Sequence, residues 1–146
     1  MHPSRFFTAK QKGLIKDSIR EAELNTSGEI RIHIDKRCKG DALDRAAYVF
    51  EMLGMHKTKL RNGVLFYLAI EDHKFAILGD AGINSLVPDH FWDEIRDNMS
   101  KSFQEGNFTE GIIEGIIAAG NQLKNHFPYQ KDDVNELPDE ISFGDK

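Results

Sequence analysis

Asn62-Gly-Val-Leu-Phe-Tyr-Leu-Ala-Ile70 is the stretch that organises this sequence. Its residues are apolar on both faces of an extended chain and include many strand formers, which is typical of a central strand covered by helices on both sides. Glu71-Asp-His73 makes a tight connection to Lys74-Phe-Ala-Ile-Leu-Gly79. Residues 62–79 therefore predict an antiparallel hairpin in the middle of a sheet.

A further strand precedes this hairpin. Apolar and polar residues alternate with a period of two from Glu29 to Asp35, as they do in a strand with one buried face. Because the second face is polar, we expect this strand near a sheet edge or under a thin cover. The helix between the two strands makes them parallel neighbours joined by a right-handed crossover. The inward face should hold Ile30, Ile32 and Ile34.

Helix signals surround these strands. Thr8-Ala-Lys-Gln11 has the pattern of a capping box and predicts the start of the first helix. Asp41 caps a second helix that Gly54 closes. Pro88 is suited to the first turn of a third helix, and Thr109 caps a fourth. For the second helix we expect a buried face of Leu43, Ala46, Ala47, Phe50 and Leu53.

These elements predict an α/β fold: a small α/β/α sandwich with a mixed sheet and the order α-β-α-β-β-α-α. The fourth helix also carries a smooth face of small residues. In a soluble domain we expect that face to let the helix approach the sheet closely. Its members are Gly111, Gly115, Ala118 and Ala119.

The composition excludes several classes of protein. The 146 residues include 19 Lys and Arg against 24 Asp and Glu. The sequence has no basic stripe of the kind that binds nucleic-acid phosphates. The longest nearly uninterrupted apolar run, residues 63–70, is too short to cross a bilayer, and no secretion signal is visible at the N-terminus. The single cysteine, Cys38, cannot form an internal disulfide, so the sequence does not require an oxidising compartment. We therefore expect a cytoplasmic protein with no transmembrane segment and no nucleic-acid partner.

The acid excess is concentrated at the C-terminus. Residues 129–146 hold six Asp and Glu against two Lys and little apolar material, which favours a flexible acidic tail. We therefore divide the chain into a domain at residues 1–128 and a tail at residues 129–146. Ile141 and Phe143 are the tail residues that could dock, and residues 137–144 could form a short partner-binding segment.

Four motifs in this order resemble the TPM domain family over about residues 8–127. The motifs are Ser27-Gly-Glu-Ile-Arg-Ile-His-Ile34, Arg61-Asn-Gly-Val-Leu-Phe-Tyr-Leu-Ala69, Ile77-Leu-Gly-Asp-Ala-Gly-Ile83 and Gly111-Ile-Ile-Glu-Gly-Ile-Ile117. The resemblance implies a small α/β sandwich. It also implies acid phosphatase activity and photosystem II repair in a plant-type branch, and membrane-associated or receptor-accessory roles in others.

The strand directions predict one candidate site. The starts of the first and second strands should meet the end of the third at one sheet edge. A phosphate or carboxylate would bind there while a carboxylate acts as a base or holds calcium or magnesium. The alternative is structural: Asp80 caps the next turn, Arg61 pairs with Glu29, and the glycines satisfy turns. The residues concerned are Glu29, Arg61, Asn62, Gly79, Asp80 and Gly82.

The remaining polar groups are weaker candidates. A charged cluster at the opposite sheet edge is typical of solvated surface. The six histidines lack the short spacing of a zinc site, and the sequence contains no nucleophile elbow, P-loop or dinucleotide fingerprint. The cluster consists of Asp35, Lys36, Asp72, His73 and Lys74.

Two functions follow from these observations. The first is a binding or regulatory module that serves an envelope-associated assembly through a protein partner, which could itself be membrane-associated. The alternative is a weak metal-assisted phosphomonoesterase that uses Glu29, Arg61, Asn62 and Asp80.

Overall fold

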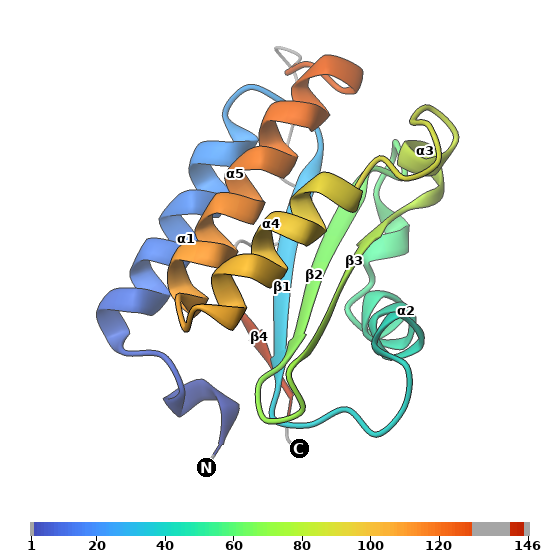
Figure 1. Cartoon of the computed structure of the whole chain (residues 1–146). Coiled ribbons are helices and arrows are strands. Elements are labelled where there is room, and N and C mark those ends of the chain that lie inside the picture. The colour runs from blue at the N-terminus through green and yellow to red at the C-terminus, as the bar shows by residue number, and fades with distance from the viewer. Residues whose placement is uncertain (1, 130–140, 145–146) are drawn as a thin grey trace.

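The computed structural model describes residues 2–129 and 141–144 and has three layers (Figure 1). Helices α1, α4 and α5 cover one face of a four-stranded sheet, and α2 covers the other. The expected α/β/α sandwich with a mixed sheet is confirmed. The helices are α1 (Ala9–Glu23), α2 (Ala42–Met52), α3 (Ala81–Asn84), α4 (Asp93–Gln104) and α5 (Phe108–His126), with short 3-10 turns η1 (Pro3–Arg5) and η2 (Met55–Lys57).

The sheet has the strand order β3-β2-β1-β4. β1 runs parallel to β2, and β2 pairs with β3 as the antiparallel hairpin that the sequence predicts. β4 lies on the outer side of β1 and runs parallel to it. The strands are β1 (Glu29–Asp35), β2 (Gly63–Ala69), β3 (Lys74–Gly79) and β4 (Ser142–Phe143).

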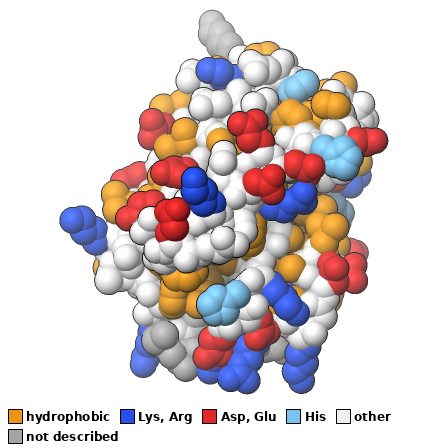
Figure 2. Space-filling model, viewed as in Figure 1, with side chains coloured by type: hydrophobic (Ala, Val, Ile, Leu, Met, Phe, Trp, Pro, Cys, Tyr) orange, Lys and Arg blue, Asp and Glu red, His pale blue; other side chains and the backbone are white. Residues whose placement is uncertain are grey.

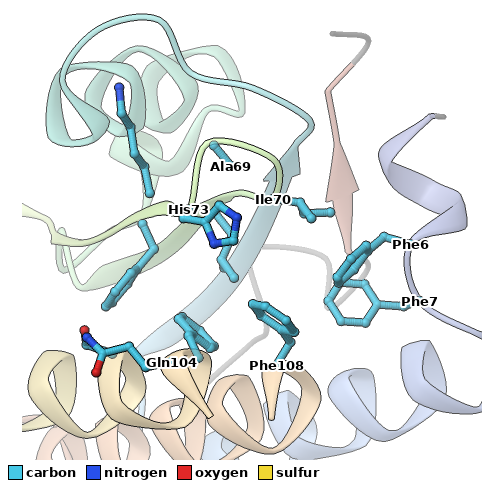
Figure 3. A pocket seen from close by; sticks show the side chains of 12 residues that line it. Phe6, Phe7, Ala69, Ile70, His73, Gln104 and Phe108 are labelled. Carbon is cyan, nitrogen blue, oxygen red and sulfur yellow. The ribbon is translucent and has the colours of Figure 1, made fainter. Parts of the chain in front are cut away.

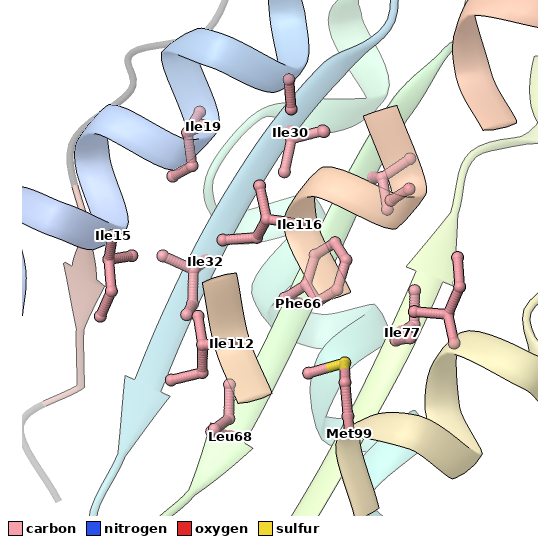
Figure 4. Close-up of a cluster of buried hydrophobic side chains, with 14 of the residues drawn as sticks. Ile15, Ile19, Ile30, Ile32, Phe66, Leu68, Ile77, Met99, Ile112 and Ile116 are labelled. Atoms are coloured by element: carbon pink, nitrogen blue, oxygen red, sulfur yellow. The ribbon is translucent and has the colours of Figure 1, made fainter. Parts of the chain in front are cut away.

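The core is divided by the sheet into two clusters. The larger lies under α1, α4 and α5, where side chains of Ile30 and Ile32 of β1 meet Phe66 and Leu68 of β2 (Figure 4). The smaller lies under α2 and includes Val49, Phe50 and Tyr67. All seven residues of β2 are buried, as expected for a strand covered on both faces.

Local signals place the first helix correctly. The Thr8 hydroxyl accepts a hydrogen bond from the Gln11 amide, and the Gln11 side chain accepts one from the Thr8 amide, so the capping box is formed. The third predicted helix begins later than expected, because α4 starts at Asp93 and not in the turn at Pro88. The Phe91 amide instead donates to the Pro88 carbonyl in a separate turn.

The expected place of β1 near a sheet edge is confirmed, since the two-residue β4 lies outside it, but its polar face is enclosed, with Glu29 4%, His33 1% and Asp35 0% exposed. The buried face expected for α2 is wrong in part. On α2, Leu43 and Ala47 are exposed while Ala46, Val49 and Phe50 are buried.

The rotation of α2 has a polar cause. In the observed orientation Arg45 reaches inward, and its Nε lies 3.0 Å from Oδ2 of Asp35. A helix turned to bury Leu43 and Ala47 would carry Arg45 away from that carboxylate. The buried charge on β1 therefore helps to decide which side of α2 faces the sheet.

The smooth face of α5 packs against helices and not against the sheet. A Cβ on Gly115 would lie 2.5 Å from Sδ of Met99 on α4, and one on Gly111 would lie 2.8 Å from the Phe103 ring. At the other end, Gly120 faces Ala22 of α1. In the described part of the chain, no helix combines the length and apolar character needed to span a bilayer.

The expected tail is described only in part. Residues 130–140 and 145–146 lie outside the described residues, so the flexibility expected for them stays a prediction. Ile141 and Phe143 are half-buried and pack against the larger core cluster. We call residues 141–144, which include β4, the tail strand.

Candidate functional site

The three predicted corners meet in space. Glu29 pairs with Gly63 at the start of β1 and β2, and the Glu29 amide donates to the Asn62 carbonyl at 3.2 Å. At the end of β3, the Asp80 amide donates to the Gly63 carbonyl at 3.0 Å. The strand directions inferred from the sequence are therefore those of the structure, and they gather Glu29, Arg61, Asn62, Gly79, Asp80 and Gly82 at one sheet edge.

Arg61 and Asp80 bind each other at this edge. The guanidinium donates from Nε to Oδ2 and from Nη2 to Oδ1 of the carboxylate, both at 2.8 Å. Oδ1 also accepts the Ala81 amide at 2.7 Å, as the cap of α3. The bidentate hydrogen bond to Asp80 raises the pKa of Arg61. Since the Asp80 side chain is 4% exposed and the Arg61 side chain 49% exposed, the guanidinium covers the carboxylate.

The neighbouring residues complete a tight backbone corner. Asn62 is buried and donates from Nδ2 to the Ser27 carbonyl at 3.0 Å. Gly82 lies against the preceding loop so closely that a Cβ would stand 2.1 Å from the Leu60 carbonyl oxygen. A Cβ on Gly79 would lie 3.3 Å from the indole of Trp92. The contacts of Asn62, Gly79 and Gly82 within the protein therefore fix the backbone at this corner.

The predicted calcium or magnesium ligands do not form a set. β2 lies between β1, which carries Glu29, and β3, which leads into Asp80. Both Asp80 oxygens already accept hydrogen bonds from Arg61. Among residues 2–129 and 141–144, no three or more His, Cys, Asp and Glu side chains are grouped so that they could hold a metal ion. The donor set at this edge therefore does not fit a divalent cation.

A buried polar network lies elsewhere, between β1, α2 and the tail strand. Asp35 is its centre: Oδ1 lies 2.9 Å from Nε2 of His33, and Oδ2 accepts from Arg45 at 3.0 Å and from the Tyr67 hydroxyl at 2.7 Å. Nδ1 of His33 lies 2.8 Å from Oγ of Ser142. We call these five residues the Asp35 network.

The network keeps Asp35 ionised. Burial alone would raise the pKa of this carboxyl, but hydrogen bonds from His33, Arg45 and Tyr67 outweigh it and hold the pKa far below its ordinary value. Burial, together with the hydrogen bond to Asp35, raises the pKa of the Tyr67 phenol well above its ordinary value. The site is therefore a fixed buried anion surrounded by donors.

Ser142, His33 and Asp35 are connected in the order of a nucleophile, a base and an orienting acid. The His33 side chain is 1% exposed, so a substrate's leaving group has no access to the imidazole for protonation. The arrangement instead holds the tail strand on β1. The sequence contained a signal for this network only in the alternation of β1, because Arg45 and Tyr67, which donate to Asp35, and Ser142, which contacts His33, come from other elements of the chain.

A separate cavity of about 240 Å³ opens beside the β2–β3 hairpin (Figure 3). Phe6 and Phe7 come from the segment before α1, Phe108 comes from the start of α5, and the exposed residues His73 and Gln104 also line the cavity. The remaining lining residues are Leu68, Ala69, Ile70, Lys74, Phe75, Ser100 and Phe103. An aromatic lining with a few polar rim groups is typical of a site for an apolar group.

The charged cluster expected at this end of the sheet is divided by burial. Asp35 belongs to the network described above, whereas Asp72 and His73 are exposed. Nζ of Lys74 donates to the Cys38 and Gly40 carbonyls, each at 2.9 Å. On the face seen in Figure 2, basic side chains are interspersed with acidic ones.

The layers and the mixed sheet define a small α/β/α sandwich domain. The family model described as the TPM domain matches residues 2–122. The chain belongs to the TPM domain family. No match was found among curated proteins.

Solved structures share this fold. The chain is 51% identical to the BA42 protein from the psychrophilic bacterium Bizionia argentinensis, with a TM-score of 0.90 over 96% of this chain and 97% of that one. The N-terminal domain of a P. gingivalis protein is 20% identical, with a TM-score of 0.69 over 85% and 80% of the two chains. An N-terminal domain from Corynebacterium glutamicum is 13% identical, with a TM-score of 0.65 over 81% and 74%. The last two likenesses concern the fold alone.

Proposed function

We propose that this TPM domain is a cytoplasmic binding module whose aromatic cavity receives an apolar side chain of a protein partner. The observation that carries the proposal is the cavity itself, in which aromatic side chains surround a space of about 240 Å³. Half-buried Phe6, Phe75, Phe103 and Phe108 face a space open to solvent there. Filling it with an apolar group would remove aromatic surface from water, which favours association.

Arg61 and Asp80, which are paired with each other at the opposite end of the sheet, support binding over catalysis. A phosphomonoesterase at that edge would need Arg61 to hold a phosphate and Asp80 to act as a base or a metal ligand. Each already satisfies the other through two hydrogen bonds of 2.8 Å. The association with an envelope assembly rests on the family resemblance, and the cytoplasmic location on the single buried thiol of Cys38.

A cavity-filling variant tests the binding site. Ser100 lines the cavity from α4, and Ser100→Phe should place a ring in the space without removing a core side chain. Asp97→Phe puts the same ring on an exposed position of α4 and is the matched control. The immobilised full chain and the control should capture the same protein from the native host, and Ser100→Phe should lose it. Equal capture by all three chains would contradict the proposal.

Hydrolysis of p-nitrophenyl phosphate tests the alternative function. We expect the same background rate with calcium, with magnesium and with a chelator, and no change on Asp80→Asn. A metal-dependent rate that Asp80→Asn abolishes would establish the phosphomonoesterase and not the binding module.

A further inference from the structure

The aromatic cavity has the size and the walls to hold a ring. Its volume of about 240 Å³ exceeds the roughly 150 Å³ of an engineered apolar cavity that holds benzene. Phe6 and Phe108 meet edge to face, at 82° and a centroid distance of 5.7 Å. Phe75 and Phe103 do the same, at 85° and 5.1 Å. A planar guest among these rings would meet both faces and edges, as aromatic pairs prefer, with room left for a small substituent.

Three polar side chains on the wall of the cavity have no hydrogen bond of their own. His73, Ser100 and Gln104 line the space, and none of these side chains is hydrogen bonded within the part of the chain that the structure describes. Ser100 is also half-buried. Imidazole, hydroxyl and amide groups can each pair with a hydroxyl, which both donates and accepts. A guest ring that carries a hydroxyl would therefore find partners here.

The charges around the cavity favour a neutral guest. Nζ of Lys74 already donates to the Cys38 and Gly40 carbonyls, each at 2.9 Å. Among the described residues, no Asp, Glu or Arg lines the space. An ionised group entering it would lose hydration without gaining a free partner of opposite charge on those residues. A hydroxyl on the ring fits these surroundings better than a carboxylate or an ammonium group.

The backbone of His73 supports a role for its side chain. Its φ of 54° lies in the left-handed region, which glycine adopts without steric cost and which hairpin loops commonly give to glycine. Histidine stands there instead, and Figure 3 shows it reaching from the hairpin toward the helical side of the cavity. Strained backbone of this kind concentrates at sites that contact ligands.

We propose that the cavity binds a phenol, a neutral aromatic ring whose hydroxyl forms hydrogen bonds with the group of His73, Ser100 and Gln104. This inference rests on the proposed function, because it names the chemistry of what the same cavity receives. A phenol can belong to a tyrosine side chain of the partner or to a free phenolic compound. The two sources share this chemistry and are separated by the test.

NMR titration of the full chain with p-cresol and toluene tests the hydroxyl, since the two differ only in that group. p-Cresol should shift the amide signals of the residues that line the cavity and bind at least about threefold more tightly than toluene. His73→Gly should reduce this ratio at least about twofold without lowering the midpoint of urea unfolding. Ser100→Phe should abolish binding of both compounds, whereas Asp97→Phe should retain it.

Titration with N-acetyltyrosinamide separates the sources. Shifts at the same residues would show that a tyrosine side chain attached to backbone can enter, in support of this inference and of the proposed function. Binding of p-cresol without binding of N-acetyltyrosinamide would identify a free phenolic compound as the ligand. That result would support the inference and contradict the proposed function.

Three results would overturn the inference: equal affinity for p-cresol and toluene, an unchanged affinity ratio in His73→Gly, or no shift with p-cresol at about 10 mM. If Ser100→Phe loses its dispersed spectrum, the comparison of the two compounds on the unchanged chain still decides. None of the three results bears on the capture experiment, because a side chain without a hydroxyl could still be the group that Ser100→Phe excludes. Failure of the inference and failure of the proposed function are therefore distinguishable.

Discussion

Asp35 carries its charge where water does not reach. Its side chain is 0% exposed and accepts hydrogen bonds from Arg45 and Tyr67 on one oxygen while His33 contacts the other. Such a carboxylate stabilises the fold because its donors replace the lost hydration, and it becomes a strong source of instability when one partner is removed.

The pH dependence of stability tests this role. The native pKa of Asp35 lies below its ordinary value, whereas the unfolded carboxyl titrates near about pH 3.9. The charge therefore contributes fully above about pH 5 and loses its contribution as the pH falls below about 4. Asp35→Asn should lower the unfolding free energy by about 3–5 kcal/mol at pH 7, and by less at about pH 2–3, in urea titrations.

The control for this measurement is Asp97→Asn on the exposed face of α4. It should change the unfolding free energy by less than about 0.5 kcal/mol. A loss in Asp35→Asn that stayed constant from pH 7 to pH 2 would show that shape and not charge is responsible.

Gly82 is a residue that the corner at Arg61 requires for space. A Cβ there would lie 2.1 Å from the Leu60 carbonyl oxygen and 2.6 Å from that of Arg61, and backbone cannot rotate away as a side chain can. Gly82→Ala should lower the unfolding free energy by at least about 2 kcal/mol in urea.

Gly13 supplies the opposite case. It lies in α1, and a Cβ added there would have no heavy atom of residues 2–129 and 141–144 within 4 Å beyond its own helix backbone and chain neighbours. Gly13→Ala should raise the unfolding free energy by about 0.5–1 kcal/mol through helix propensity and unfolded-state entropy. Equal effects of the two substitutions would mean that crowding at Gly82 does not decide its cost.

At the scale of elements, α5 makes two kinds of close contact. Gly115 faces the flexible side chain of Met99, whereas Gly120 faces the Cβ and backbone of Ala22, whose carbonyl oxygen would lie 2.8 Å from an added Cβ. Alanine gains about 1 kcal/mol of helix propensity at either position. Gly115→Ala should therefore be nearly neutral, while Gly120→Ala should lose about 1–2 kcal/mol net. Thermal and urea unfolding of both variants would check this order, and a larger loss at Gly115 would contradict it.

Periodicity and capping predicted most of these elements because both are local. The Thr8–Gln11 capping box and the hairpin at residues 62–79 need only neighbouring residues, and both are present. The strand directions then followed from connection rules, which is why the corners at Arg61 and Asp80 could be brought together in advance.

Non-local partners were beyond such reasoning. The alternation of β1 indicated a polar face but could not show that Arg45 and Ser142 would enclose it. For the same reason the pairing of Arg61 with Asp80 was not chosen over pairing with Glu29, since all three residues share one corner. The sequence predicted a face of α2 that includes Leu43 and Ala47, and the contact between Arg45 and Asp35 turns the helix so that Val49 is buried instead.

At the scale of the whole molecule, the tail strand attaches a segment near the C-terminus to the outer side of β1. The Gly144 amide, hydrogen bonded to Ile34 at 2.9 Å, should exchange with deuterium at least about tenfold more slowly than an open chain, as about 1.4 kcal/mol of local stability requires. Asp35→Asn should remove this protection because it loosens His33. Protection unchanged in that variant would separate the tail strand from the Asp35 network.

The indole of Trp92, which lies beside Gly79, is an intrinsic fluorescence probe. Trp92 is the only tryptophan in the chain, and its indole lies beside the corner that holds Arg61 and Asp80. Its fluorescence therefore comes from one known position. A shift in emission wavelength or a change in quenching by iodide will report opening of that corner without any added label.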